Sequence, residues 1–269
     1  MKKTAVLPML KWAGGKRWLV RSDDFVIPDK IGAYFEPFLG GGSVFFYLQP
    51  EFGVVSDKNP ELINFYEIVR DYPLKMKEEI ERHQTLHNKE HYYRIRELEP
   101  QCVLERAARF LYLNRACWNG LYRVNRKGRF NVPIGTKQKI AFESDDFEVV
   151  SKLLKQIELR CADFEEVISE ASENDFVFVD PPYTVKHNLN GFIKYNDEMF
   201  SWQDQERLQR SVERAANRGC YVTVTNADHD SVKSLYTNAN YRQISRASII
   251  AGPKHKRMEI TEAIYTYNH

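Results

Sequence analysis

A strand, a three-glycine turn, a helix and a second strand follow one another between residues 33 and 57. Residues 33–36 predict a short strand, and residues 44–48 predict a helix directly after the turn at Gly40-Gly41-Gly42. Residues 53–56 predict a second strand, which ends at Asp57. Strands that alternate with helices in this way form sheets with helices packed on their faces. The chain is therefore expected to be an α/β protein.

The alternation of strands and helices continues toward the end of the chain. Asn59 followed by Pro60 is typical of a helix start, with Asn as N-cap and Pro at the first helical position. Ser201 and Asp204 form a capping-box pattern at the start of a helix over residues 203–217. Further strands are expected at residues 157–161, 176–179, 221–225, 241–247 and 259–267.

The middle of the chain follows a different pattern. Residues 73–117 are helical and polar in pattern, and residues 118–142 form a long irregular stretch, which in compact domains is usually functional. The length of 269 residues fits one α/β domain with a smaller insert. We therefore predict a main domain made of residues 1–60 and 140–269, and a mainly helical insert at residues 61–139.

Composition excludes several classes of protein. Hydrophobic residues make up 43% and charged residues 28%, so disordered and fibrous classes are excluded. No apolar run approaches the roughly 20 residues needed to cross a bilayer. The basic N-terminus breaks at Pro8, so it is not expected to be a signal peptide. The four cysteines form no CxxC pair, and we expect buried, reduced thiols in a cytoplasmic protein without a structural metal.

The formal net charge of +2 hides a segregation of charge along the chain. Residues 140–206 carry 16 acidic against five basic residues, whereas residues 242–257 carry five basic residues and no acid. Residues 106–139 also lack acids and contain nine basic residues interleaved with aromatics: Arg106, Arg109, Arg115, Arg123, Arg126, Lys127, Arg129, Lys137 and Lys139. This favours nucleic-acid binding over a solvated basic face. For Arg106 and Arg109, surface charges on a packed helix remain an equal alternative.

Two strand ends carry the residue types of a ligand site. Asp57 follows Gly40 by 17 positions, close to the spacing at which a carboxylate grips the ribose of a bound nucleoside. The turn matches neither a GxGxxG nor a P-loop pattern, so NAD and ATP are not favoured.

A second motif, Asp180-Pro181-Pro182-Tyr183, follows the apolar strand at residues 176–179. A carboxylate beside proline carbonyls makes a rigid acceptor pocket suited to an amine, and Tyr183 offers a flat face to a base.

Four ordered motifs then indicate a family. The segments KWAGGK at residues 11–16 and FEPFLGGGS at residues 35–43, the acid Asp57 and DPPY at residues 180–183 resemble the DNA adenine methylases of the Dam type. Segments at residues 113–123 and 128–135 resemble that family's DNA-reading region. The resemblance implies a Rossmann-like methyltransferase sheet with helices on both faces, interrupted by a DNA-recognition domain. It also implies transfer of a methyl group from S-adenosylmethionine to adenine N6 in double-stranded DNA, commonly at GATC.

The resemblance also implies roles for individual residues. The catalytic set is Asp180, Pro181, Pro182 and Tyr183. The set expected to contact S-adenosylmethionine is Trp12, Lys16, Glu36, Phe38, Gly40, Gly42, Asp57, Asp163, Phe164 and Asp180. The set expected to contact DNA is Lys11, Trp118, Asn119, Leu121, Tyr122, Arg123, Asn131, Pro133 and Lys137. A monomer that associates with the nucleoid through DNA is expected, and a dimer on DNA stays open.

The expected mechanism is direct attack of adenine N6 on the methyl group, with the base flipped out of the duplex. Asp180 and the Pro181 carbonyl would accept the N6 hydrogens, and no cysteine nucleophile is needed. Three alternatives remain open at this point: methylation of cytosine N4 or of adenine in RNA, a catalytically inactive DNA-binding protein, and a small-molecule methyltransferase. The sequence also leaves open whether the enzyme is solitary, belongs to a phage or partners a restriction enzyme.

Overall fold

A computed structural model describes residues 6–120, 122–125, 128–185, 200–247 and 259–268. It contains a seven-stranded sheet with strand order β3-β2-β1-β4-β5-β7-β6. The strands are β1 (Tyr34–Glu36), β2 (Gly53–Asp57), β3 (Glu158–Cys161), β4 (Phe176–Val179), β5 (Tyr221–Ala227), β6 (Asn240–Ala247) and β7 (Glu259–Tyr267). Each strand expected from the sequence is therefore present, and β5 extends two residues beyond its predicted end.

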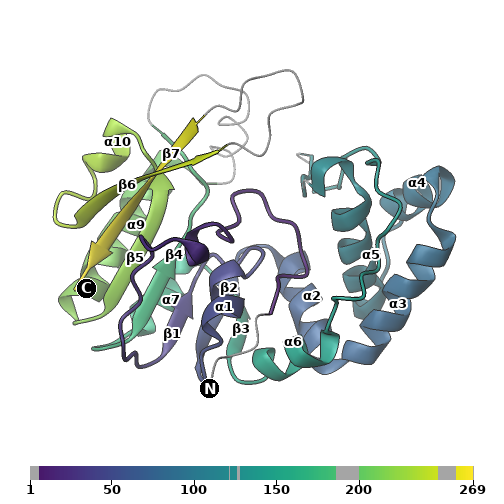
Figure 1. The fold of residues 1–269 in the computed structure, drawn as a ribbon, viewed down its shortest axis with the longest axis horizontal. Coiled ribbons are helices and arrows are strands. Elements are labelled where there is room, and N and C mark those ends of the chain that lie inside the picture. The colour runs from purple at the N-terminus through teal and green to yellow at the C-terminus, as the bar shows by residue number, and fades with distance from the viewer. Residues whose placement is uncertain (1–5, 121, 126–127, 186–199, 248–258, 269) are drawn as a thin grey trace. The chain divides into compact units, whose positions relative to one another are not determined.

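The sheet is parallel except at its C-terminal edge. Strands β2 and β3, β1 and β4, and β4 and β5 pair in parallel, whereas β7 pairs antiparallel with both β5 and β6. Figure 1 shows β7, in yellow, lying along β5 and β6. This order, with helices flanking the sheet, is a Rossmann-like methyltransferase arrangement and confirms the predicted fold class.

Helices occupy the segments between the strands, and their starts follow the predicted caps. The Asn59 side chain accepts hydrogen bonds from the N–H groups of Glu61 and Leu62, and Ser201 and Asp204 form the capping box. The helices are α1 (Ser43–Leu48), α2 (Pro60–Asp71), α3 (Pro73–Leu86), α4 (Lys89–Glu97), α5 (Val103–Ala116), α6 (Phe147–Leu154), α7 (Phe164–Glu170), α9 (Trp202–Asn217) and α10 (Asp230–Lys233). Two 3-10 turns, η1 (Leu19–Arg21) and η2 (Trp118–Gly120), also lie within the described residues.

The chain divides by packing into two compact units. Unit 1 contains residues 1–22 and 39–161, and unit 2 contains residues 23–38 and 162–269. Helix α5 packs against α2, α3 and α4 inside unit 1, and α7 packs against α9 inside unit 2. The recognition insert at residues 61–139 is defined by its expected function and remains a prediction.

The basic run at residues 106–139 is partly internal to the fold. Arg115 is 2% exposed, and its two terminal nitrogens lie 2.6 and 2.7 Å from the carboxylate oxygens of Asp145. Arg115 also donates to the backbone carbonyls of Met9 and Ile140. Arg106 pairs with Glu61, and Arg109 donates to two carbonyls at the end of α4. These three arginines stabilise unit 1, which favours the packed-helix alternative for Arg106 and Arg109.

Two further observations bear on the sequence expectations. Cys117 and Cys220 are buried, but Cys102 and Cys161 are exposed, so the expectation of four buried thiols was wrong for two of them. Both exposed cysteines lie at ends of secondary-structure elements, where the neighbouring loop leaves the side chain in solvent. Over the described part of the chain, no helix has the length and apolar character needed to cross a membrane.

The ion pair of Arg115 and Asp145 should carry a large share of the stability of unit 1. Replacing Arg115 with Met leaves the Asp145 carboxylate buried without its partner, so unfolding free energy should fall by about 3–5 kcal/mol. Urea unfolding measures this difference. The matched control is Arg82→Met, at an exposed arginine paired with Glu79, and it should change stability by less than about 1 kcal/mol. Equal effects of the two substitutions would contradict a structural role for Arg115.

Candidate active site

The glycine turn after β1 adopts a conformation that only glycine fits well. Gly40 and Gly42 have φ angles of +48° and +67°, in the left-handed region. A Cβ atom on Gly40 would lie 2.7 Å from the indole ring of Trp12, and one on Gly42 would lie 2.9 Å from the ring of Phe46. Both backbone conformation and close packing therefore require glycine at these positions. The absence of Cβ atoms in this turn lets the Trp12 ring pack directly against its backbone.

Asp57 fastens this turn to the end of β2. One carboxylate oxygen accepts the N–H of Gly40 at 3.0 Å, and the other accepts the N–H of Asn59 at 3.0 Å. Burial raises the pKa of Asp57, and the backbone N–H groups around it oppose that rise. The spacing of Gly40 and Asp57 in the sequence thus corresponds to direct contact. A carboxylate that accepts backbone hydrogen bonds still has acceptor positions for a ligand hydroxyl.

The segment Lys11–Lys16 is held in place by α5. The Asn114 side chain, fully buried, accepts the backbone N–H of Lys11 at 2.9 Å and donates to the Lys11 carbonyl at 2.7 Å. Because Asn114 and Arg115 bond to the segment 9–11, the Leu113-Asn114-Arg115 motif anchors the chain inside unit 1. Lys16 is 2% exposed, and its ammonium group donates to the Gly14 carbonyl at 2.6 Å.

An aromatic cluster connects Trp12 to the expected DNA-reading region. The Trp12 and Tyr122 rings stack with centroids 5.9 Å apart and planes 15° apart. Tyr122 also contacts Phe110 on α5 at 4.7 Å and Phe130 at 5.6 Å between ring centroids. Tyr122, expected to contact DNA, is therefore packed among rings of the protein.

Most other residues expected to contact DNA lie on the exposed side of the segment 118–137. Backbone hydrogen bonds fold this segment on itself, from Trp118 N–H to the Pro133 carbonyl at 2.9 Å and from Asn131 N–H to the Arg123 carbonyl at 3.2 Å. The Arg123 guanidinium donates to the Asn131 side chain at 3.0 Å. Leu121 lies outside the described residues. The exposed members of the expected set are Trp118, Asn119, Arg123, Asn131, Pro133 and Lys137.

Lys11 lies beside this segment. Its side chain crosses Gly120 so closely that a Cβ there would lie 2.4 Å from the Lys11 Cδ. Burial, and then the neighbouring ammonium group of Lys137, lower the pKa of Lys11 to about 8. Two cations held this close favour an anion between or beside them. The carbonyl of Lys137 is fixed by His87 at 3.0 Å.

In unit 2, the acid of the DPPY motif stands at the end of the fully buried strand β4. Strand β5 pairs with β4 so that Val179 faces Val224, which places Asp180 beside Thr225. The Thr225 hydroxyl donates to Asp180 at 2.7 Å. Gln205 on α9 donates to the Pro182 carbonyl at 3.3 Å. The DPPY loop is thus fixed by neighbours on β5 and α9 that the sequence analysis did not identify.

Tyr183 is fixed by a buried acid on β7. Its hydroxyl donates to Glu262 on β7 at 2.6 Å, and Glu262 is 1% exposed. Burial, followed by the negative charges of Asp180 and Glu262, raises the pKa of Tyr183 well above its ordinary value. The phenol therefore keeps its proton at any working pH. An acid within the apolar strand 259–267 was the available sequence signal for Glu262.

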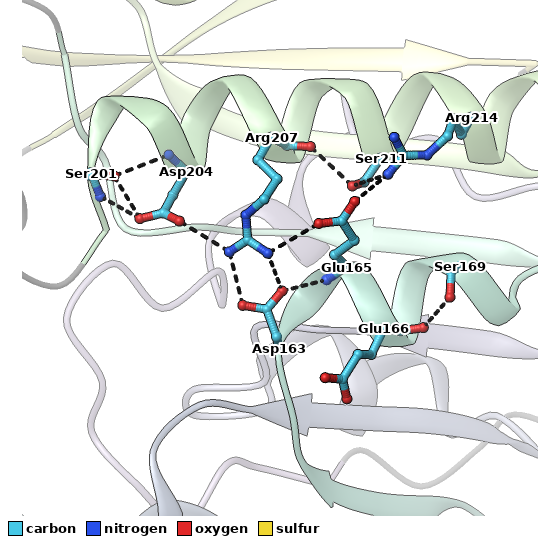
Figure 2. Close-up of polar contacts among 9 residues, drawn as sticks. All are labelled: Asp163, Glu165, Glu166, Ser169, Ser201, Asp204, Arg207, Ser211 and Arg214. Carbon is cyan, nitrogen blue, oxygen red and sulfur yellow. Dashed lines mark hydrogen bonds and ion pairs between the residues drawn. The ribbon is translucent and has the colours of Figure 1, made fainter.

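A polar and aromatic cluster surrounds Asp163 and Phe164. Asp163 caps α7 by accepting the Glu165 N–H at 3.0 Å, and Arg207 from α9 bonds both of its carboxylate oxygens at 2.6 and 2.9 Å (Figure 2). Figure 2 also shows Arg207 reaching Glu165 and Asp204. The guanidinium carbon lies 4.2 Å from the Phe164 ring centroid.

Of the other expected cofactor residues of unit 2, Phe38 joins this cluster, whereas Glu36 bonds to a different partner. The Phe38 ring stacks on Phe164 with centroids 5.5 Å apart and planes 24° apart. Glu36, 2% exposed at the end of β1, accepts the hydroxyl of Tyr34 at 2.9 Å. The structure therefore brings Phe38, Asp163 and Phe164 together, with Arg207 as a partner that sequence reasoning missed. Within the described ranges, no group of three or more His, Cys, Asp or Glu side chains is arranged to hold a metal ion.

Comparison with known proteins agrees with these features. Residues 12–250 match the family model of the D12 class N6 adenine-specific DNA methyltransferases. The Type II methyltransferase M1.LlaDCHI of Lactococcus lactis is 36% identical over 98% of this chain and 96% of its own length. The Type II methyltransferase M.MjaIII of Methanocaldococcus jannaschii is 34% identical over 94% of this chain and 96% of its own length.

A third relative carries a different name. The DNA adenine methylase of Vibrio cholerae serotype O1 is 33% identical over 95% of this chain and 94% of its own length. The matched family region contains the glycine turn, Asp57 and the DPPY loop. The chain therefore belongs to the D12 class of N6 adenine-specific DNA methyltransferases.

Proposed function

We propose that this methyltransferase moves the methyl group of S-adenosylmethionine to N6 of an adenine flipped out of duplex DNA, at GATC or a related short site. The observation that carries the proposal is the fixed DPPY loop. Asp180, held by Thr225 at the end of a buried strand, offers a carboxylate that is already oriented before the base arrives. An oriented acceptor costs no reorganisation during reaction.

The described residues fit S-adenosylmethionine by the chemistry of their side chains. Trp12 packs against the glycine turn, where the backbone lacks Cβ atoms that would hinder close approach, and Asp57 can accept hydroxyl groups of a ribose. Phe38, supported from below by the buried Phe164 ring, is proposed to offer an aromatic face to a purine, and Asp163, oriented by Arg207, an acceptor for its amine. The remaining proposed contacts are Lys16, Glu36, Gly40, Gly42 and Asp180. When bound, the cofactor supplies a methyl group activated by a positively charged sulfur.

The chain's own part in the reaction is to orient the target amine. Asp180 and the carbonyl of Pro181 accept the two N6 hydrogens, which withdraws the nitrogen lone pair from the ring and directs it outward. The Asp180 carboxylate stabilises the positive charge that develops on N6, and the methylated nitrogen then releases one proton to solvent to become neutral. Tyr183 remains a neutral phenol bonded to Glu262, so it presents its ring to the base and takes no proton.

Recognition of the duplex is assigned to unit 1. The exposed residues of the segment 118–137 would contact bases and phosphates, and Arg123 is the proposed bidentate partner of a guanine. Lys11 and Lys137 form the proposed phosphate site, because a phosphate relieves the repulsion between their ammonium groups. Trp118, 53% exposed, is available to fill the space that the flipped adenine leaves.

Asp180 and its hydrogen-bond partner should differ in their effect on turnover. Asp180→Asn should lower the rate of methyl transfer by about 100- to 1,000-fold while duplex binding survives. Thr225→Val removes one hydrogen bond to the carboxylate and should cost about ten- to one hundredfold. Incorporation of a labelled methyl group into duplex adenine measures both.

The control is Thr223→Val, at a buried threonine two residues away on β5, which should keep most of the turnover. Substantial turnover by Asp180→Asn would overturn the proposed function of the DPPY loop.

Arg123 and Arg129 provide a matched test of base recognition. Arg123→Ala should cost about 1–3 kcal/mol of discrimination at one base pair of the site. Arg129→Ala, at an exposed arginine of the same segment paired with Glu99, should leave discrimination unchanged. Competition binding with duplexes changed at each position of GATC measures the difference. Equal discrimination by wild type and Arg123→Ala would remove Arg123 from the recognition set.

The pKa of Lys11 predicts how duplex affinity depends on pH. Because the pKa of free Lys11 is lowered to about 8 and a phosphate contact requires the proton, binding takes up a proton above that pH. Affinity should change little from pH 7 to 8 and fall roughly tenfold per unit at higher pH. Lys11→Arg keeps its charge and should flatten the profile. Identical slopes for the two proteins between pH 8 and 9.5 would contradict the assignment.

A further inference from the structure

We infer that Tyr122 is a positioning residue through which cofactor binding and duplex binding strengthen each other. The inference rests on the proposed function, since it takes Trp12 and the glycine turn as cofactor contacts and the segment 118–137 as the duplex contact. It assigns Tyr122 a role distinct from the direct DNA contact expected from the sequence.

A continuous row of contacts joins the two proposed surfaces within unit 1. Gly40 lies against the Trp12 indole, at a distance that leaves no room for a methyl group. Trp12 stacks on Tyr122 in a near-parallel arrangement, with 5.9 Å between ring centroids and 15° between planes. The orientation of the indole therefore fixes the orientation of the tyrosine ring.

Tyr122 belongs to the segment 118–137, and its ring connects that segment to this row of contacts. Its backbone precedes Arg123, whose carbonyl accepts the Asn131 N–H at 3.2 Å and whose side chain donates to Asn131 at 3.0 Å. The ring itself also contacts Phe130, across the same fold of the chain, at 5.6 Å. The orientation of the Tyr122 ring therefore affects the position of Arg123 and Asn131, which are proposed to contact DNA.

The packing of the Tyr122 ring argues against its insertion into DNA. The ring contacts three aromatic neighbours, Trp12, Phe110 and Phe130, and the side chain is only partly exposed. Insertion between bases would require all three contacts to break. Trp118 is far more exposed and needs no such change.

Coupling follows from ordering of shared side chains. A ligand that holds the Trp12 indole restricts the Tyr122 ring, so the second ligand meets a segment that is already ordered. Such coupling is reciprocal, and each ligand must raise the affinity of the other by the same factor, typically five- to 150-fold.

The test measures that factor with the full chain. Calorimetry gives the Kd of S-adenosylhomocysteine with and without a saturating 20-base-pair duplex that contains GATC, and duplex binding is measured with and without S-adenosylhomocysteine. We expect wild type to show a factor within the stated range. Tyr122→Leu should bring this coupling factor close to one, and Tyr122→Phe, which keeps the ring, should retain the wild-type factor.

Controls separate the possible roles of the side chain. Tyr47→Leu, at a half-exposed tyrosine of α1, should leave the factor unchanged. If Tyr122→Leu fails to fold in a thermal scan, Tyr122→Met keeps the volume without a planar ring and is expected to lose the coupling.

Three outcomes with the variants overturn the inference. These are an equal loss of duplex affinity with and without S-adenosylhomocysteine, unchanged coupling in Tyr122→Leu, and loss of coupling in Tyr122→Phe. Wild type that binds both ligands with a factor of one also overturns it. Wild type that binds no S-adenosylhomocysteine contradicts the proposed function instead, so the two failures are distinguishable.

Discussion

The hydrogen-bond pair between the Asn114 side chain and the Lys11 backbone is the contact on which the geometry of unit 1 depends. A buried amide that both donates to and accepts from one backbone residue fixes that residue in position and direction. Arg115 adds a bond to the Met9 carbonyl. Trp12 follows directly and reaches the glycine turn, so one end of a buried helix determines the surface proposed to bind the cofactor. The Trp12 ring also stacks on Tyr122, which belongs to the segment 118–137 proposed to contact DNA.

In unit 2, the register of neighbouring strands positions the DPPY loop. The pairing of β4 with β5 brings Thr225 to Asp180, and the antiparallel strand β7 supplies Glu262 to Tyr183. Asp180, the Pro182 carbonyl and the Tyr183 hydroxyl of the DPPY loop therefore each have a partner from a neighbouring strand or from α9. Buried polar groups of this kind are costly unless they form hydrogen bonds, and groups that form them hold one orientation.

The net charge of +2 says little about this chain, because its basic residues divide between internal ion pairs and an exposed segment.

Local sequence signals predicted the fold well. Asn59-Pro60 and the Ser201–Asp204 box start helices as expected, because caps act over three or four residues. The spacing of Gly40 and Asp57 predicted a carboxylate beside the glycine turn, and the structure shows that Asp57 accepts the N–H of Gly40 there. Long-range partners were not predictable in this way. Arg115 bonds Asp145 and Arg207 bonds Asp163 across 30 and 44 residues, and nothing local distinguishes these arginines from basic residues that face solvent. Within the charge run at residues 106–139, Arg115 is therefore part of an internal ion pair and not of an exposed basic surface.

The proposed function is tested most directly by a map of modified bases in the genome of a methylation-free host that expresses this protein. We expect N6-methyladenine at one short duplex site, GATC or a close relative, and none when the Asp180→Asn variant is expressed at the same level. N4-methylcytosine, or a genome without modified bases despite a folded protein that binds DNA, would contradict it.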